Sequence, residues 1–95
     1  MARLQRAKPN QLVSGDWLDG AANGASAAAA QVVARRLRTA IGDKSFRSIQ
    51  QLTGVPHSTV RRILVGDAWA DLETIVKLEV GLDIDLLGGW RSEAK

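Results

Sequence analysis

The 95-residue sequence contains no cysteine, no tyrosine and a single histidine. The absence of cysteine excludes disulfide bonds, thiolate metal ligands and thiol nucleophiles. With one histidine, a zinc site built only from protein ligands is not expected either, so we expect no metal and no cofactor. Aromatic residues make up only 4% of the chain, so its core has to be built mainly from aliphatic side chains.

Long hydrophobic runs are also missing. No stretch approaches the roughly 18 apolar residues that a membrane span needs, and the alanine run Ala27–Ala30 lacks the basic start and long apolar centre of a secretion signal. We therefore expect no membrane contact and a cytoplasmic location. The length suits one domain, and no phosphate loop, nucleophile–base pair or metal constellation is visible, so an enzyme is not expected.

Charge is divided unevenly along the chain. Residues 1–66 contain ten Lys or Arg and three Asp, a formal balance of +7, whereas residues 67–95 have a balance of −4. A basic pole favours a polyanionic partner such as nucleic acid. Solvated helix faces explain the same charges equally well, so the charge alone leaves both interpretations open.

Residues 1–24 show no sustained helical or strand period and are rich in turn-forming residues. We interpret them as a basic N-terminal arm, and the sequence leaves open whether it is ordered or flexible. An apolar cluster in the arm could dock on the domain or on a partner; it consists of Leu12, Val13, Trp17 and Leu18.

Residues 25–88 have the pattern of a helical domain, followed by a tail at 89–95. Helices are expected over residues 26–40, 45–53, 57–65 and 71–81, with a last short turn through Leu86 and Leu87 before Gly88 and Gly89 end the folded part. The expected caps are Ser26, Ser45 and Asp71, Pro56 fits the start of the third helix, and the expected terminators are Gly42, Gly54 and Gly66.

Apolar residues recur in these helices at spacings of three and four, which places them on one face. The expected inward-facing residues are Val33, Leu37, Ile41, Ile49, Leu52, Val60, Ile63, Leu64, Leu72, Ile75, Val76 and Leu78. Arg35, Arg36 and Arg38 are expected to face outward, and at least one of them is expected to be simply solvated. Trp69 is expected to lie in the core or to pack between helices, and Trp90 is left as either disordered or part of a dimer contact.

Two short helices joined by a glycine-bearing turn are typical of a helix-turn-helix. The segment from Ser45 to Gly66, SFRSIQQLTGVPHSTVRRILVG, resembles the helix-turn-helix of the lambdoid repressor/Cro superfamily, also called the XRE family. The resemblance covers roughly Val33 to Leu87. Positions that match the family are Ile49, Gly54, Val60, Ile63 and Gly66.

Two positions depart from the family pattern. Gln50 stands where the family usually has a small alanine between the two helices, and Ala70 stands where a proline is common before the fourth helix. The first departure is expected to loosen or tilt the helix pair.

The resemblance implies an all-α, repressor-like domain of four or five helices whose third helix enters the major groove of double-stranded DNA. The implied base-reading residues are His57, Ser58, Arg61 and Arg62, with an arginine on guanine. The implied phosphate-binding residues are Lys44, Ser45, Phe46, Arg47 and Thr59, and Thr59 has packing as its alternative role. Arg3, Arg6 and Lys8 of the arm are candidates for the DNA backbone or minor groove, although a merely solubilising arm is equally open.

We therefore expect a sequence-specific transcriptional regulator, a phage-type or Cro-like repressor that binds a palindromic site as a homodimer. One alternative is an antitoxin-like autorepressor whose arm binds a protein partner. Another is an architectural or protein-interaction module that does not read sequence. A lone histidine is more often a surface residue, so His57 is not expected to be a metal ligand or catalytic base.

Overall fold

The computed structural model describes residues 6–94. The elements in chain order are η1 (Pro9–Leu12, a 3-10 helix), β1 (Val13–Ser14), β2 (Ala21–Ala22), α1 (Ala25–Ile41), α2 (Phe46–Thr53), α3 (His57–Leu64), α4 (Leu72–Leu82) and α5 (Trp90–Glu93). The expectation of a mainly helical domain is confirmed for the described residues. The antiparallel hairpin of β1 and β2, in which Val13 pairs with Ala22, was not expected.

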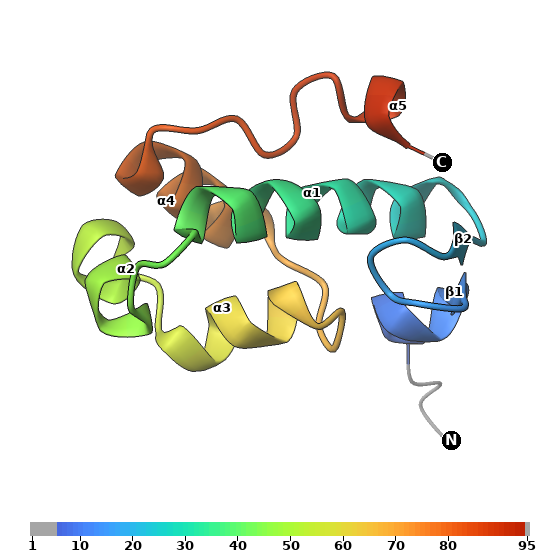
Figure 1. Ribbon diagram of the computed structural model, residues 1–95, viewed down its shortest axis with the longest axis horizontal. Helices are drawn as coiled ribbons and strands as arrows, with labels where there is room; N and C mark the ends of the chain where they lie inside the picture. The colour runs from blue at the N-terminus through green and yellow to red at the C-terminus, as the bar shows by residue number, and fades with distance from the viewer. Residues whose placement is uncertain (1–5, 95) are drawn as a thin grey trace, which may run out of the picture.

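The longest helix, α1, is the central element. Figure 1 shows it running across the molecule, with α3 on one side and the C-terminal segment that carries α5 on the other. The hairpin and η1 lie near the start of α1, whereas α2 and α4 gather near its end. Because neighbours cover α1 from several directions, Val32, Ala34 and Leu37 are completely buried.

Two of the three predicted helix caps are confirmed. The Ser45 hydroxyl accepts a hydrogen bond from the Ser48 N–H at the start of α2, and the Asp71 carboxylate accepts one from the Thr74 N–H at the start of α4. The prediction that Ser26 caps α1 is wrong. That helix begins one residue earlier, after Gly24, which has no side chain to cap with.

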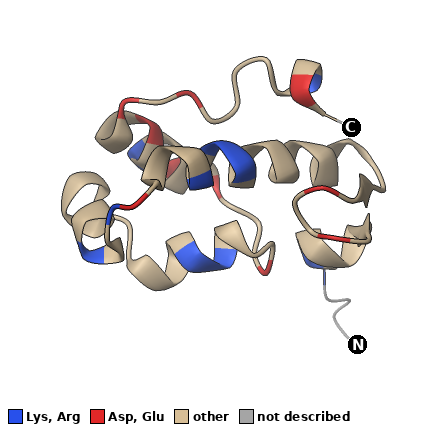
Figure 2. Ribbon diagram, in the orientation of Figure 1, with Lys and Arg blue, Asp and Glu red and all other residues tan. Residues whose placement is uncertain are grey.

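α2 and α3 are joined by a short turn. Gly54 ends α2 with φ 75°, in the left-handed region that glycine adopts without steric cost, and its N–H donates to the Gln50 carbonyl. Val55 is buried and Pro56 directly precedes α3, as predicted for its entrance. Both helices carry basic residues, as Figure 2 shows.

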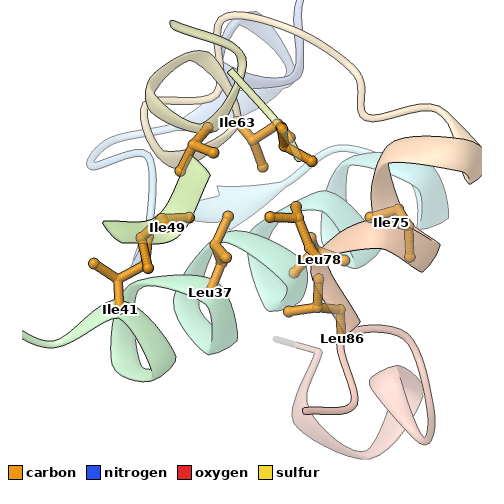
Figure 3. Packing of buried hydrophobic residues seen from close by; sticks show 10 residues of the cluster. Leu37, Ile41, Ile49, Ile63, Ile75, Leu78 and Leu86 are labelled. Carbon is orange, nitrogen blue, oxygen red and sulfur yellow. The ribbon is translucent and has the colours of Figure 1, made fainter. Parts of the chain in front are cut away.

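The core lies between α1, α2, α3, α4 and the segment after α4. Figure 3 shows its large side chains, among them Leu37, Ile41, Ile49, Ile63, Ile75, Leu78 and Leu86, pointing toward one another. α4 faces this core with Ile75 and Leu78. The prediction that Leu72 and Val76 of α4 and Leu52 of α2 also face inward is wrong, because these side chains are 72%, 48% and 53% exposed.

The C-terminal segment is folded, contrary to the prediction that Gly88 and Gly89 end the folded part. No helical turn runs through Leu86 and Leu87; instead α5 follows Gly89, and Trp90 is half-buried at its start. The C-terminal segment is held in place by an arginine that was expected to face solvent. Arg36 donates to the carbonyls of Leu86 (3.1 Å) and Gly88 (2.6 Å) and forms an ion pair with Glu93.

Arg35 also differs from its prediction. It is half-buried and donates to the carbonyls of Leu18 (2.7 Å) and Glu93 (3.2 Å), so it ties the arm to the C-terminal segment. Arg38 is exposed, as expected for at least one member of this group. Within residues 6–94 there is no helix with the length and apolar character that crossing a bilayer requires.

Candidate nucleic-acid interface

The two sides of α3 differ sharply in exposure. Val60 and Ile63 are buried in the core, and Thr59 is half-buried. The exposed side carries all four residues predicted to read bases: His57, Ser58, Arg61 and Arg62. Residues spaced by three or four positions share a helix face, which is why the sequence placed these side chains together correctly.

The start of α2 lies beside the start of α3. The rings of Phe46 and His57 have centroids 6.2 Å apart, and both side chains are exposed. The first N–H groups of a helix have no partner within it. At α2 the Ser45 hydroxyl takes the Ser48 N–H, while the N–H groups of Phe46 and Arg47 have no partner among the described residues.

The segment from Lys44 to Gly66 carries four cations and no Asp or Glu. Its cations are Lys44, Arg47, Arg61 and Arg62, and all four are exposed. The first three form no ion pair with any carboxylate in the described part of the chain. A surface with uncompensated positive charge of this kind attracts polyanions.

Asp67 lies just beyond α3 and joins the arm to this surface. Its carboxylate is 2.7 Å from the Lys8 ammonium and 3.7 Å from the Arg62 guanidinium. The hydrogen bond from Lys8, helped by the charges of Lys8 and Arg62, holds the pKa of the Asp67 carboxyl below its ordinary value of 3.8. One of the three predicted arm cations is therefore held close to the C-terminal end of α3.

The other two arm cations are placed differently. Arg3 lies outside the described residues. Arg6 stacks on Trp69, with its guanidinium carbon 4.4 Å from the ring centroid, and the Trp69 N–H donates to the Ala7 carbonyl at 2.7 Å. Trp69 is thus half-buried and packs against the arm, rather than in the core or between helices as expected.

Three consecutive carbonyls, one at the end of α3 and two just beyond it, accept hydrogen bonds from the arm. The Trp17 indole donates to Leu64 (3.0 Å), the Asn10 amide side chain donates to Val65 (3.1 Å), and the Asn10 backbone N–H donates to Gly66 (2.9 Å). The last carbonyls of a helix have no partner within it. The arm therefore supplies the partners, and sequence reasoning missed this role for Asn10 and Trp17.

Gln50, the departure from the family pattern, does not pack between the two helices. Its side chain is exposed, and its amide oxygen accepts a long hydrogen bond of 3.4 Å from the His57 N–H at the start of α3. Gln50, Gln51, Arg47 and His57 line a shallow hollow of about 350 Å³. The Gln50 side chain thus adds a polar group to the exposed surface between α2 and α3.

No protein-family model, curated protein or solved structure matches the chain. Residues 6–94 contain no group of three His, Asp or Glu side chains arranged to hold a metal ion. What this surface can bind therefore has to follow from its shape, its exposed hydrogen-bonding groups and its charge.

Proposed function

We propose that the protein binds specific sites on double-stranded DNA and regulates transcription, acting as a repressor. The observation that carries this proposal is the exposed side of α3, where His57, Ser58, Arg61 and Arg62 stand together with no acidic residue between them. An α-helix fits the major groove, which is about 12 Å wide. In this proposal α3 lies in the groove, and α2 crosses the DNA backbone beside it.

Arg61 is the strongest candidate for reading a base. An arginine can donate two hydrogen bonds to O6 and N7 of guanine, a contact that discriminates against other bases by about 1–3 kcal/mol. Arg61 is exposed and has no carboxylate neighbour in the described chain, whereas Arg62 is 3.7 Å from Asp67. Arg62 is therefore assigned to either a base or a phosphate, and Arg61 to a base.

Phosphate-binding groups flank both ends of α3. At its start are the cations Lys44 and Arg47 and the N–H groups of Phe46 and Arg47, which suit a phosphate at a helix N-terminus. At its end is Lys8, held there by Asp67. Contacts to phosphates on both sides would fix the orientation of the helix in the groove without reading sequence.

A homodimer is part of this proposal. Two copies related by a two-fold axis can place two α3 helices in successive turns of the major groove, about 34–36 Å apart, on a palindromic site.

The antitoxin-like alternative would need the apolar cluster of the arm to be free to bind a protein partner. Trp17 instead donates to α3, and the Leu18 carbonyl accepts from Arg35, which favours the arm as part of the domain.

The salt dependence of binding tests whether DNA is the partner. A labelled mixed-sequence duplex is titrated with protein between about 50 and 200 mM NaCl, where each neutralised phosphate contributes roughly 0.9 to the slope of log affinity against log salt. The double variant Lys44→Ala/Arg47→Ala should flatten that slope by about 2. The matched variant Arg38→Ala/Arg91→Ala removes the same charge from exposed positions outside this surface and should leave the slope nearly unchanged.

Absence of duplex binding would contradict the proposal and point to a protein-interaction module. Equal slopes for the two double variants would show that the surface of α2 and α3 is not the one that meets DNA.

A further inference from the structure

An apolar cleft of about 320 Å³ opens between the arm, α1, the end of α3 and the start of α4. Its walls include the indoles of Trp17 and Trp69, its floor includes Ala29 and Ala30, and the core residue Ile63 reaches it from α3. Its lining within the described part of the chain includes no Asp or Glu. The volume lies at the lower end of the range of small-molecule pockets, roughly 300–1,000 Å³.

The shape of the cleft is maintained by short side chains on α1 and by two tryptophans that are hydrogen-bonded elsewhere. The side chains of Ala29 and Ala30 are too short to fill the space above α1. The indole N–H groups of Trp17 and Trp69 are hydrogen-bonded to the Leu64 and Ala7 carbonyls, which restrains both side chains. A ligand would therefore enter a largely preformed site with flat aromatic walls.

One cation marks the rim of the cleft. Among residues 6–94, Arg6 is the only charged residue in its lining; it is exposed, and it forms no ion pair with a carboxylate of this range. Its guanidinium lies over the Trp69 ring, 4.4 Å from the centroid. We propose that the cleft binds a small, flat, apolar molecule with a single anionic group, an aromatic carboxylate or sulfonate, whose ring lies between the indoles and whose anion pairs with Arg6.

A ligand bound in the cleft would affect how α3 is held. Ile63 is both a lining residue and a core residue of α3, and Trp17 lines the cleft while it binds the Leu64 carbonyl at the end of the same helix. A ligand that shifts either side chain therefore changes how α3 is held. This regulatory consequence rests on the proposed DNA-binding function, whereas the binding site itself does not.

Two fluorescent probes with the same aromatic body test the site without DNA. Anilinonaphthalene sulfonate is anionic, and phenylnaphthylamine is its uncharged counterpart. Both are titrated onto the Trp90→Phe variant, in which Trp17 and Trp69 supply all the tryptophan fluorescence, and energy transfer from them reports that the probe is bound to the protein. Each probe should bind saturably at one site.

Variants separate the contribution of charge from that of shape. Arg6→Gln should weaken binding of the anionic probe by up to about fivefold, the upper end of the range for an exposed ion pair, and leave the neutral probe unchanged. Arg38→Gln, an exposed arginine outside the lining, should change neither. Ala30→Phe fills the floor and should weaken both probes at least about tenfold, with circular dichroism and urea unfolding verifying that the variant is folded.

Dissociation constants weaker than about 1 mM for both probes would overturn the proposal. Equal effects of Arg6→Gln on the affinities of the two probes would overturn it as well. It would also be overturned if a dimer of this protein bound probe only after it dissociated, because a second copy of the chain would then cover the cleft. The anionic probe should also change DNA affinity; tight probe binding with no such change would overturn the regulatory consequence alone. A protein that binds probe but no DNA would refute the proposed function and leave the ligand site standing.

Discussion

The indole N–H of Trp17 donates a 3.0 Å hydrogen bond to the carbonyl oxygen of Leu64, a residue 47 positions later at the end of α3. Together with the two bonds from Asn10, it provides partners for the Leu64 carbonyl, which the end of α3 leaves open, and for the carbonyls of Val65 and Gly66 just beyond it. The described part of the arm, residues 6–24, is thus held against the end of α3. The position of α3 depends on Asn10 and Trp17, although neither belongs to the proposed DNA surface.

The Trp17→Phe variant tests this contact, because it removes the N–H and keeps an aromatic ring near Gly66. We expect the free energy of unfolding to fall by about 1 kcal/mol, the net value of one hydrogen bond, in urea titrations followed by circular dichroism. Trp90→Phe is the control, since the Trp90 indole has no hydrogen-bond partner in the described chain, and it should change stability by less than about 0.5 kcal/mol. Equal losses for the two variants would contradict the role assigned to Trp17.

Two arginines on the same helix should differ greatly in their importance for stability. Arg36→Ala deprives the Leu86 and Gly88 carbonyls and the Glu93 carboxylate of their donor, and should cost about 2 kcal/mol. Arg38 is exposed and binds none of these groups, so Arg38→Ala should stay within about 0.5 kcal/mol. Thermal and urea unfolding of both variants measure the difference, and a neutral Arg36→Ala would show that the C-terminal segment is not held in this way.

The two left-handed glycines of the α2–α3 unit should respond differently to a methyl group. At Gly54 an added Cβ meets no atom within 4 Å, so Gly54→Ala should cost only the left-handed strain, about 1–2 kcal/mol. At Gly66 the Cβ would lie 2.5 Å from the Trp17 ring, so Gly66→Ala should cost roughly 1–3 kcal/mol more through forced repacking. Urea unfolding measures the stability of both variants. Equal losses in the free energy of unfolding would show that Trp17 does not pack on Gly66 in solution.

The helical elements could largely be predicted because their signals are local. Ser45 and Asp71 each cap a residue three positions away, and Gly54 and Gly66 end helices at the positions where left-handed backbone is needed. The exposed side of α3 follows from helical spacing alone, so His57 and Arg61 were correctly placed together.

The contacts that were missed join residues far apart in the sequence. Trp17 bonds to Leu64, and Arg36 bonds to carbonyls at least 50 positions later. Both bonds end on backbone oxygens, which every residue has, so the sequence carries no partner signal for them. The hairpin has only two residues in each strand, too few to show an alternating pattern.

Stability should fall in acid because of two carboxylates near the ends of the α3–α4 connection. The hydrogen bond from Lys8 lowers the pKa of Asp67, and the hydrogen bond from the Thr74 backbone N–H lowers the pKa of Asp71, both from an ordinary value of 3.8. A folded-state pKa below the unfolded one stabilises the protein at pH values above 3.8, and this stabilisation is lost as the pH falls through the folded values. The double variant Asp67→Asn/Asp71→Asn lacks both carboxylates, so it cannot lose this stabilisation by protonation.

Urea unfolding at a series of pH values from about 6 to about 2 measures this effect. We expect the double variant to lose less stability than the wild-type protein over that range. Asp43→Asn/Asp83→Asn, a control at two exposed aspartates whose carboxylates accept no hydrogen bond within residues 6–94, should follow the wild-type curve more closely. Parallel curves for the wild-type protein and Asp67→Asn/Asp71→Asn would contradict the assigned hydrogen bonds.

Selection from a library of random duplexes at near-physiological salt tests the central claim, that the exposed side of α3 reads DNA sequence. The retained duplexes are sequenced for the wild-type protein, for Arg61→Ala/Arg62→Ala and for Arg38→Ala. We predict that the wild-type protein and Arg38→Ala enrich a two-fold symmetric site containing guanine, and that the α3 variant loses the preference because each guanine contact is worth about 1–3 kcal/mol. Retention of DNA without enrichment, or the same enriched site for all three proteins, would contradict the account.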